Sequence, residues 1–148
     1  MIENPKDYHA PMHTAEHILN QTMDRMFGCG RSFISHIERK KSKCDYKINR
    51  ALTDDELKLV QQKVNEIIKS NCDVTAAFIS KAEAAKKFNL SKLPDEAGDT
   101  LRIVKVGDYD SCPCSGLHVN NTSEIGEFVI SSASFEDGVV RLRFKINE

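Results

Sequence analysis

The chain has 148 residues, of which 21 are Lys or Arg and 22 are Asp or Glu, so its net charge is -1. This length is typical of one domain with its own core, and 40% hydrophobic with 29% charged residues is the composition of a globular protein. The balanced charge excludes a global field that would draw the protein to nucleic acid or to an anionic membrane. Any contact with a polyanion must therefore be local.

The cysteines and the N-terminal residues indicate in which cellular compartment the protein is expected to work. The 5 cysteines are odd in number and scattered, unlike the dense, even spacing of a secreted disulfide scaffold. The first residues carry acid and proline where a signal peptide has a basic start and an apolar run, and no apolar stretch of about 18 residues occurs. We expect a cytoplasmic protein that does not contact a membrane.

The first elements are predicted as a helix followed by a hairpin. Apolar residues recur at helical spacing over residues 13–27, and Gly28 is a typical C-terminal stop. Alternating apolar and polar residues predict strands over residues 31–37 and 44–48. The charged segment 38–43 between them is the expected turn.

A second, amphipathic helix is predicted over residues 54–69. Thr53 and Glu56 match a capping box, in which each side chain can bond the other residue's backbone N–H. The rest of the chain predicts mainly short strands and turns. In order, these are a strand over 74–79, a capped helix over 80–88, an irregular segment over 89–98, a strand over 100–106, a loop over 107–114, and strands over 127–133 and 139–146.

The last two predicted strands form a hairpin, because Asp137-Gly138 supplies the positive φ angles of a tight turn. Together these elements predict an α+β fold: a two-layer domain with a largely antiparallel sheet and helices on one face.

Two short motifs carry the chemistry. His13 and His17 stand four residues apart in the first helix, so their Cβ atoms lie about 5 to 6 Å apart on one face. Cys114 and His118 repeat this spacing in a turn-rich loop, in which Cys112 is either a bystander or an alternate ligand. One thiolate and three imidazoles suit Zn²⁺, so the motifs predict a shared zinc site.

Both motifs resemble those of the editing domains of alanyl- and threonyl-tRNA synthetases and their free-standing relatives, the alanyl-tRNA editing proteins. That family carries H-x3-H near the start of the domain and C-x3-H near its end. Residues 114–126 are similar to the block that contains C-x3-H in the alanyl branch, and residues 52–58 with 64–68 are similar to the family's central helix. The resemblance covers residues 12–144.

The resemblance implies a single aminoacyl-tRNA editing domain over residues 1–148. Its expected activity is hydrolysis, in trans, of the ester joining a wrong amino acid to tRNA, with Ser- or Gly-tRNA(Ala) as the expected substrates. Such a second site is needed because a pocket for a small side chain discriminates weakly. The zinc ligands implied by the resemblance are His13, His17, Cys114 and His118.

Other residues of the expected site lie beside the motifs. Ser115 and Leu117 replace the glycine and threonine usual in the alanyl branch, and this difference leaves the identity of the amino acid open. The candidates for catalysis are His13, His17, Glu16 and Thr14, and those for substrate binding are Ser115, Leu117 and Gln21. The basic residues proposed to contact tRNA are Arg39, Lys40, Lys41, Lys43, Arg141 and Arg143.

Two alternative functions remain open. Residues 13–17 also match H-x-x-E-H, the motif of inverted metallopeptidases in which Glu16 would be the general base, but that reading leaves C-x3-H unexplained. Four protein ligands are typical of structural zinc, whereas catalytic zinc keeps an open position. A non-catalytic, zinc-stabilised tRNA-binding module is therefore the other alternative.

Overall fold

The computed structural model of the protein describes residues 9–87 and 100–147. In chain order its elements are α1 (Ala10–Phe27), β1 (Ile34–His36), β2 (Ser42–Lys47), α2 (Asp54–Lys69), β3 (Val74–Ser80), α3 (Lys81–Lys87), β4 (Thr100–Val106), β5 (Asp110–Pro113), the short 3₁₀ helix η2 (Thr122–Glu124), β6 (Glu127–Glu136) and β7 (Val139–Asn147). Within these described ranges, no helix is both long and apolar enough to cross a membrane.

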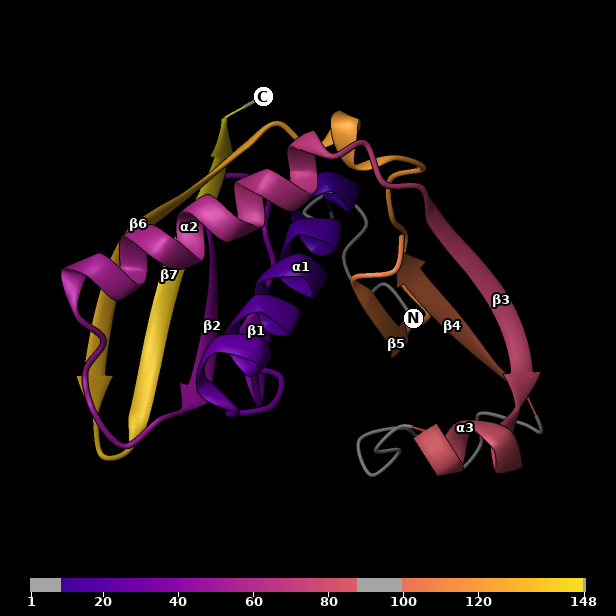
Figure 1. Cartoon of the computed structure of the whole chain (residues 1–148), viewed down its shortest axis with the longest axis horizontal. Coiled ribbons are helices and arrows are strands. Elements are labelled where there is room, and N and C mark those ends of the chain that lie inside the picture. The colour runs from indigo at the N-terminus through magenta and orange to yellow at the C-terminus, as the bar shows by residue number, and fades with distance from the viewer. Residues whose placement is uncertain (1–8, 88–99, 148) are drawn as a thin grey trace.

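The strands form two antiparallel sheets, with orders β1-β2-β7-β6 and β3-β4-β5. The predicted α+β class is confirmed, although two sheets replace the single expected one. The chain leaves the first sheet after β2 and returns to it only at β6, so β3, β4 and β5 pair among themselves. Helix α1 lies between the two sheets, as Figure 1 shows.

Most predicted boundaries agree with the structure. Helix α2 and its capping box are confirmed, as is the end of α1 at Gly28, whose φ is 63°. The loop predicted over residues 107–114 instead contains β5, a strand too short for its alternation to be recognised. Strand β1 is shorter than the predicted strand over residues 31–37. Its first residues are not paired with β2, because Arg31 hydrogen-bonds to Asp110 and the Ser32 N–H bonds to Asn20. The predicted irregular segment 89–98 lies outside the described residues.

The main core lies between the four-stranded sheet and the helices α1 and α2. Even-numbered side chains of β2 and β7 face this core, and odd-numbered ones face outward, because successive side chains in a strand alternate. The core side chains that are almost fully buried include Cys44, Tyr46, Val140, Leu142 and Phe144 from the sheet and Met12, Ala15, Ile18, Leu19 and Met23 from α1.

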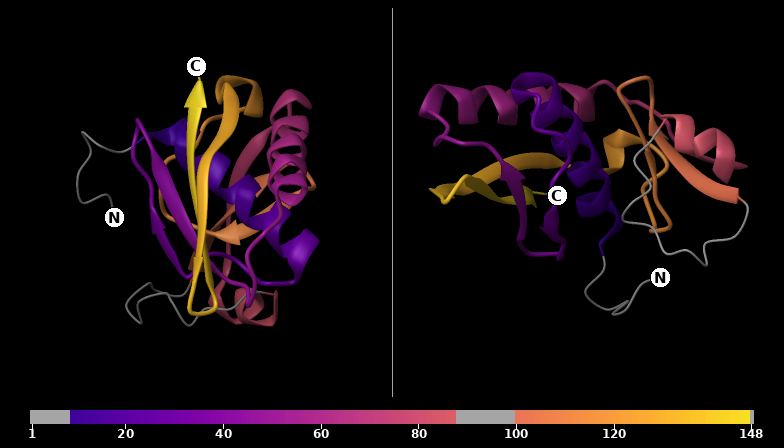
Figure 2. Two further views of the ribbon diagram at one scale, coloured as in Figure 1. Left: turned by 90° about the vertical axis from the view of Figure 1, so that its left-hand side faces the viewer. Right: turned by 90° about the horizontal axis from the view of Figure 1, so that it is seen from below.

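Polar contacts fix α1 to both sheets. On one side, Asn20 accepts hydrogen bonds from the Tyr46 hydroxyl at 2.7 Å and from the Ser32 backbone N–H at 3.2 Å. On the other side, the Thr22 hydroxyl bonds the Tyr109 hydroxyl at 2.6 Å. These contacts fix the position of α1, the helix that carries His13 and His17. Figure 2 shows the same ribbon from two further directions.

The outward face of the four-stranded sheet carries one strong ion pair. Arg141 donates from Nε and Nη2 to the two carboxylate oxygens of Asp45, at 2.8 and 2.9 Å. Hydrogen bonds from Arg141 lower the pKa of Asp45 despite the opposing effect of burial.

Because the folded pKa of Asp45 is lowered, the pair stabilises the protein above the ordinary carboxyl pKa, and this contribution is lost as pH falls through the folded value. We expect Asp45→Asn to reduce the free energy of unfolding by about 1 kcal/mol at pH 7. The difference from the wild type should shrink below about pH 4. Urea unfolding at pH 7 and pH 3 measures this, and a difference that grows on acidification would contradict it.

Candidate metal centre

Four side chains form a cluster between α1 and the loop after β5. One donor atom each from His13, His17, Cys114 and His118 lies within 4.8 Å of the other three. The Cys114 sulfur is 3.6 Å from Nε2 of His13 and 3.5 Å from Nε2 of His118. Tetrahedral zinc would place such donors roughly 3.3 to 3.6 Å apart, so the donor types and the two distances from the Cys114 sulfur fit zinc.

Hydrogen bonds orient two of the imidazoles. His118 Nδ1 lies 2.8 Å from the Thr14 hydroxyl, which also accepts the Val119 backbone N–H at 3.3 Å. His13 Nδ1 lies 3.2 Å from the Leu117 carbonyl, to which it can donate. In both residues the Nδ1 contact leaves Nε2 beside the Cys114 sulfur, the orientation that metal binding through Nε2 requires. Thr14 is fully buried behind His118 and acts on its orientation.

The third imidazole, His17, faces a buried carboxylate. Its Nδ1 lies 3.5 Å from Asp110 Oδ2, a distance typical of an ion pair and long for a hydrogen bond, and both side chains are almost fully buried. Burial opposes protonation of His17, but Asp110 and Cys114 raise its pKa to about 9. Asp110 therefore holds positive charge at His17, whether a proton or a metal ion supplies it.

Two further residues hold Asp110 in place. Arg31 donates to its two carboxylate oxygens at 2.7 and 3.3 Å, and Gln21 donates to Oδ1 at 3.0 Å. Although burial opposes ionisation, His17 and Arg31 lower the pKa of Asp110 to about 2. Neither Asp110 nor Arg31 belongs to a motif that the sequence reveals. Residue spacing gave no signal for Asp110, because β5 is too short for its alternation to be recognised in the sequence.

The two neighbouring cysteines differ in ionisation. Burial opposes ionisation of Cys114, but hydrogen bonds from the three histidines lower its pKa to about 3. Burial instead raises the pKa of Cys112 to about 11. Among the described residues the metal cluster includes Cys114 and leaves out Cys112. Of these two cysteines, Cys114 is therefore the one that offers a metal the thiolate it needs.

Arg102, from β4, holds the ligand loop. Its Nη1 donates to the carbonyls of Cys114 at 3.1 Å and Gly116 at 2.7 Å, while its own carbonyl accepts from the Cys114 backbone N–H. No sequence motif indicates this role of Arg102. The side chains of Ser115 and Leu117 point outward from the clamped loop and are exposed.

A hollow of about 710 Å³ borders the cluster on one side. Glu16 and His17 of α1 line it together with Phe33 and Lys47. Glu16 is largely buried, and its Oε1 lies 3.6 Å from Nε2 of His13. A carboxylate therefore stands beside the donor set and borders open space.

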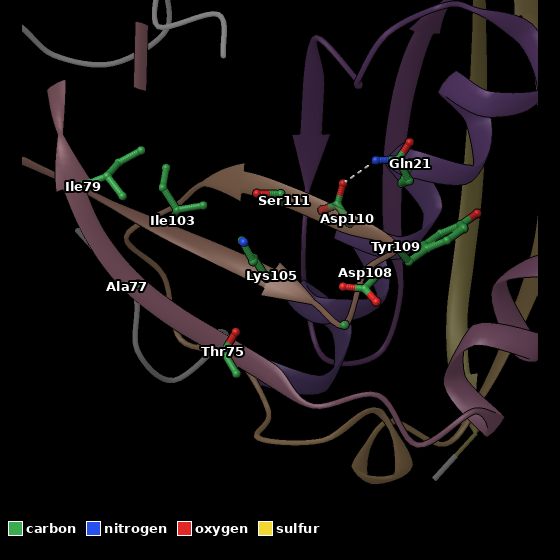
Figure 3. Close-up of a pocket in the computed structure, with 11 residues that line it drawn as sticks. Gln21, Thr75, Ala77, Ile79, Ile103, Lys105, Asp108, Tyr109, Asp110 and Ser111 are labelled. Carbon is green, nitrogen blue, oxygen red and sulfur yellow. Dashed lines mark hydrogen bonds between the residues drawn. The ribbon is translucent and has the colours of Figure 1, made fainter. Parts of the chain in front are cut away.

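A second hollow, of about 540 Å³, lies on the other side of Asp110 (Figure 3). Lys105 and Asp108 line it, and Gln21 reaches from α1 to bond Asp110 at its edge. Gln21, expected to bind substrate, thus lines this hollow and supports Asp110.

The basic residues expected to contact tRNA lie in the β1–β2 turn and on the outward face of the four-stranded sheet. Arg39, Lys40 and Lys41 are exposed in the β1–β2 turn. Lys43 and Arg143 lie on the outward face of the four-stranded sheet, where Arg141 is paired with Asp45.

Fold and site together define an α+β domain with a candidate zinc centre of one cysteine and three histidines. Residues 101–143 match the family described as "Threonyl and Alanyl tRNA synthetase second additional domain". The chain therefore contains an editing-type domain of the alanyl- and threonyl-tRNA synthetase family, a conclusion that similarity over most of the chain also supports.

The similar proteins are alanine–tRNA ligases. The ligase of Fervidobacterium nodosum is 35% identical over 132 residues, which cover 88% of this chain and 15% of the ligase. The ligase of Ligilactobacillus salivarius is 34% identical over 138 residues, covering 92% of this chain and 16% of the ligase. This chain thus spans about 15% of the length of the relatives it matches.

We expect Cys114→Ser to abolish stoichiometric zinc binding, because it replaces the soft thiolate of the cluster with a hydroxyl. Metal analysis after dialysis against a weak chelator measures this. Cys112→Ser is the matched control and should retain zinc. Equal loss in both variants would show that the site uses Cys112 as well.

We expect Asp110→Asn to weaken zinc binding about 10- to 100-fold, because it removes the charge that supports His17. Competition with a chromophoric chelator gives the affinity. Asp108→Asn, at a nearby exposed carboxylate, is the control and should bind zinc like the wild type. An unchanged affinity in Asp110→Asn would show that Asp110 serves folding alone.

Proposed function

We propose that this chain is a trans-editing hydrolase that deacylates mischarged tRNA, with Ser- or Gly-tRNA(Ala) as its substrates. The observation that carries the proposal is the His13, His17, Cys114 and His118 cluster, beside a carboxylate-lined hollow, in an editing-type domain. The relatives are named for alanine and tRNA, which supports tRNA(Ala) as the nucleic acid.

The reaction adds a water oxygen to the ester carbonyl and breaks the bond to the ribose oxygen, which takes up the proton. Glu16 is suited to accept that proton from water, since it lines the hollow beside His13 and His17. It can then return the proton to the leaving ribose oxygen. When zinc is bound, it supplies Lewis acidity that polarises an ester carbonyl or water.

Other residues of the chain fix the geometry of this step. Thr14 and Leu117 orient His118 and His13, and Arg102 holds the loop that carries Cys114. The exposed side chains of Ser115 and Leu117 would contact the aminoacyl end of the substrate at the entrance to the cluster. Their identity would therefore affect which amino acid is removed.

The alternatives make different predictions. A non-catalytic module would bind zinc and tRNA without hydrolysing the ester, and its four protein ligands would form a closed site. A metallopeptidase would cleave peptides through Glu16, yet such enzymes take an acidic third ligand, whereas Cys114 and His118 complete this cluster. The donor set thus favours the editing activity over the peptidase.

We expect zinc-loaded protein to deacylate Ser- or Gly-tRNA(Ala), with Ala-tRNA(Ala) and Ser-tRNA(Thr) as comparison substrates. Glu16→Gln should reduce kcat about 10²- to 10⁴-fold with unchanged zinc content, because it removes the proton acceptor. Cys114→Ala should lose both zinc and activity. Release of labelled amino acid from each tRNA is the measurement.

The controls separate the three functions. Glu83→Gln removes an exposed carboxylate on α3 and should leave deacylation unchanged. If fully zinc-loaded protein hydrolyses none of these esters yet binds tRNA, the proposal fails and the binding module is favoured. Cleavage of a peptide substrate that depends on Glu16 would instead favour the peptidase.

A further inference from the structure

The outward face of the four-stranded sheet places like charges side by side. Lys43 of β2 is directly opposite Arg143 of β7, and Lys145 lies two residues along β7 on the same face. We name Lys43, Arg143 and Lys145 the basic strip. Like charges in directly opposed positions destabilise a sheet, so this arrangement has an energetic cost in the free protein.

In the next outward-facing pair of residues on β2 and β7, the positive charge is neutralised. There Asp45 is opposite Arg141 and accepts two hydrogen bonds from it. Among residues 9–87 and 100–147, no ion pair within 4.0 Å involves a member of the basic strip. The strip is thus a local excess of positive charge on a chain of net charge -1.

The turn between β1 and β2 extends this charge. Lys40 and Lys41 are exposed in the turn that leads directly into β2. The Ser42 hydroxyl closes the turn by donating to the Glu38 carbonyl at 3.1 Å and accepting from the Glu38 N–H at 3.0 Å. The turn therefore holds its two lysines beside Lys43, at the same end of the sheet.

Two hollows that share Phe33 lie between the metal cluster and this face. His17, Phe33 and Lys47 all line the larger hollow, and Lys47 shares the outward face of β2 with Lys43. Phe33 also lines a second hollow of about 320 Å³ on that face, together with Arg141 and the carboxylates of Asp45, Glu136 and Asp137. The Lys47 ammonium lies 5.4 Å from the centre of the Phe33 ring. An aromatic ring and a cation thus stand between the two regions, a combination suited to single-stranded nucleic acid.

We propose that the basic strip binds the phosphate backbone of the tRNA stem while the single-stranded 3′ end follows the hollow past Phe33 to the metal cluster. The choice of tRNA as the polyanion rests on the proposed function. Contacts of lysine and arginine with phosphates supply affinity and position the substrate, and they carry no sequence information. The strip therefore sets how tightly tRNA binds, and Arg141, already paired with Asp45, contributes little.

The test uses the full chain and a tRNA(Ala) transcript that carries no amino acid. We compare the triple variant Lys43→Gln, Arg143→Gln, Lys145→Gln with a control, Lys58→Gln, Lys63→Gln, Lys69→Gln on α2, which removes the same charge elsewhere. Fluorescence anisotropy between 50 and 200 mM salt gives the Kd. The strip variant should bind about tenfold or more weakly, and its salt slope should be lower by about 2 to 3. The control should bind like the wild type.

A conservative variant guards against misfolding. Lys43→Arg with Arg143→Lys keeps both charges and should retain binding, while melting curves monitor folding of all variants. Unchanged binding by the strip variant would overturn the proposal. Equal weakening in the strip and control variants would also overturn it, because total charge rather than the strip would then determine affinity.

Further measurements separate this inference from the proposed function. If the wild type hydrolyses Ser-tRNA(Ala) and the strip variant does so with the same KM, the inference fails while the function stands. If no ester is hydrolysed but tRNA binding depends on the strip, the inference stands and the function fails. Strip-dependent binding to phosphatidylserine vesicles without tRNA binding would assign the face to a membrane and overturn the inference.

Discussion

The metal cluster depends on the hydrogen bonds that fix α1 between the two sheets. Two of its donors are on this helix and two are on a loop after β5, so any rotation or sliding of α1 would separate them. Asn20 ties the helix to the hairpin through Tyr46, and Thr22 ties it to the second sheet through Tyr109. Their buried polar groups favour one position of the helix, because leaving them without partners would be costly.

The electrostatics of the site follow from that position. Asp110 can support His17 only because Arg31 and Gln21 compensate its burial. The same network explains why neighbouring cysteines differ, since Cys114 faces the imidazoles while Cys112 does not join them. The chain thus presents a thiolate and oriented imidazoles in advance, which reduces the reorganisation that binding a metal would require.

Sequence patterns predicted the local features and missed those that depend on distant contacts. The four-residue spacing of His13 and His17 and the capping box of α2 are local, and the structure agrees with both. Arg31 and Arg102 act on partners far away in sequence, so no spacing indicated their roles. The basic strip likewise required the register of β2 with β7, which residue patterns alone do not fix.

The wide sequence separation of the donors bears on how the protein folds. Cys114 meets His13 across 101 residues, so the cluster can form only when most of the chain has folded. During synthesis, the histidines of α1 leave the ribosome long before their partners exist. A metal that joins the two segments would bind the folded chain in preference to the unfolded one, so the free energy of metal binding would add to the free energy of unfolding.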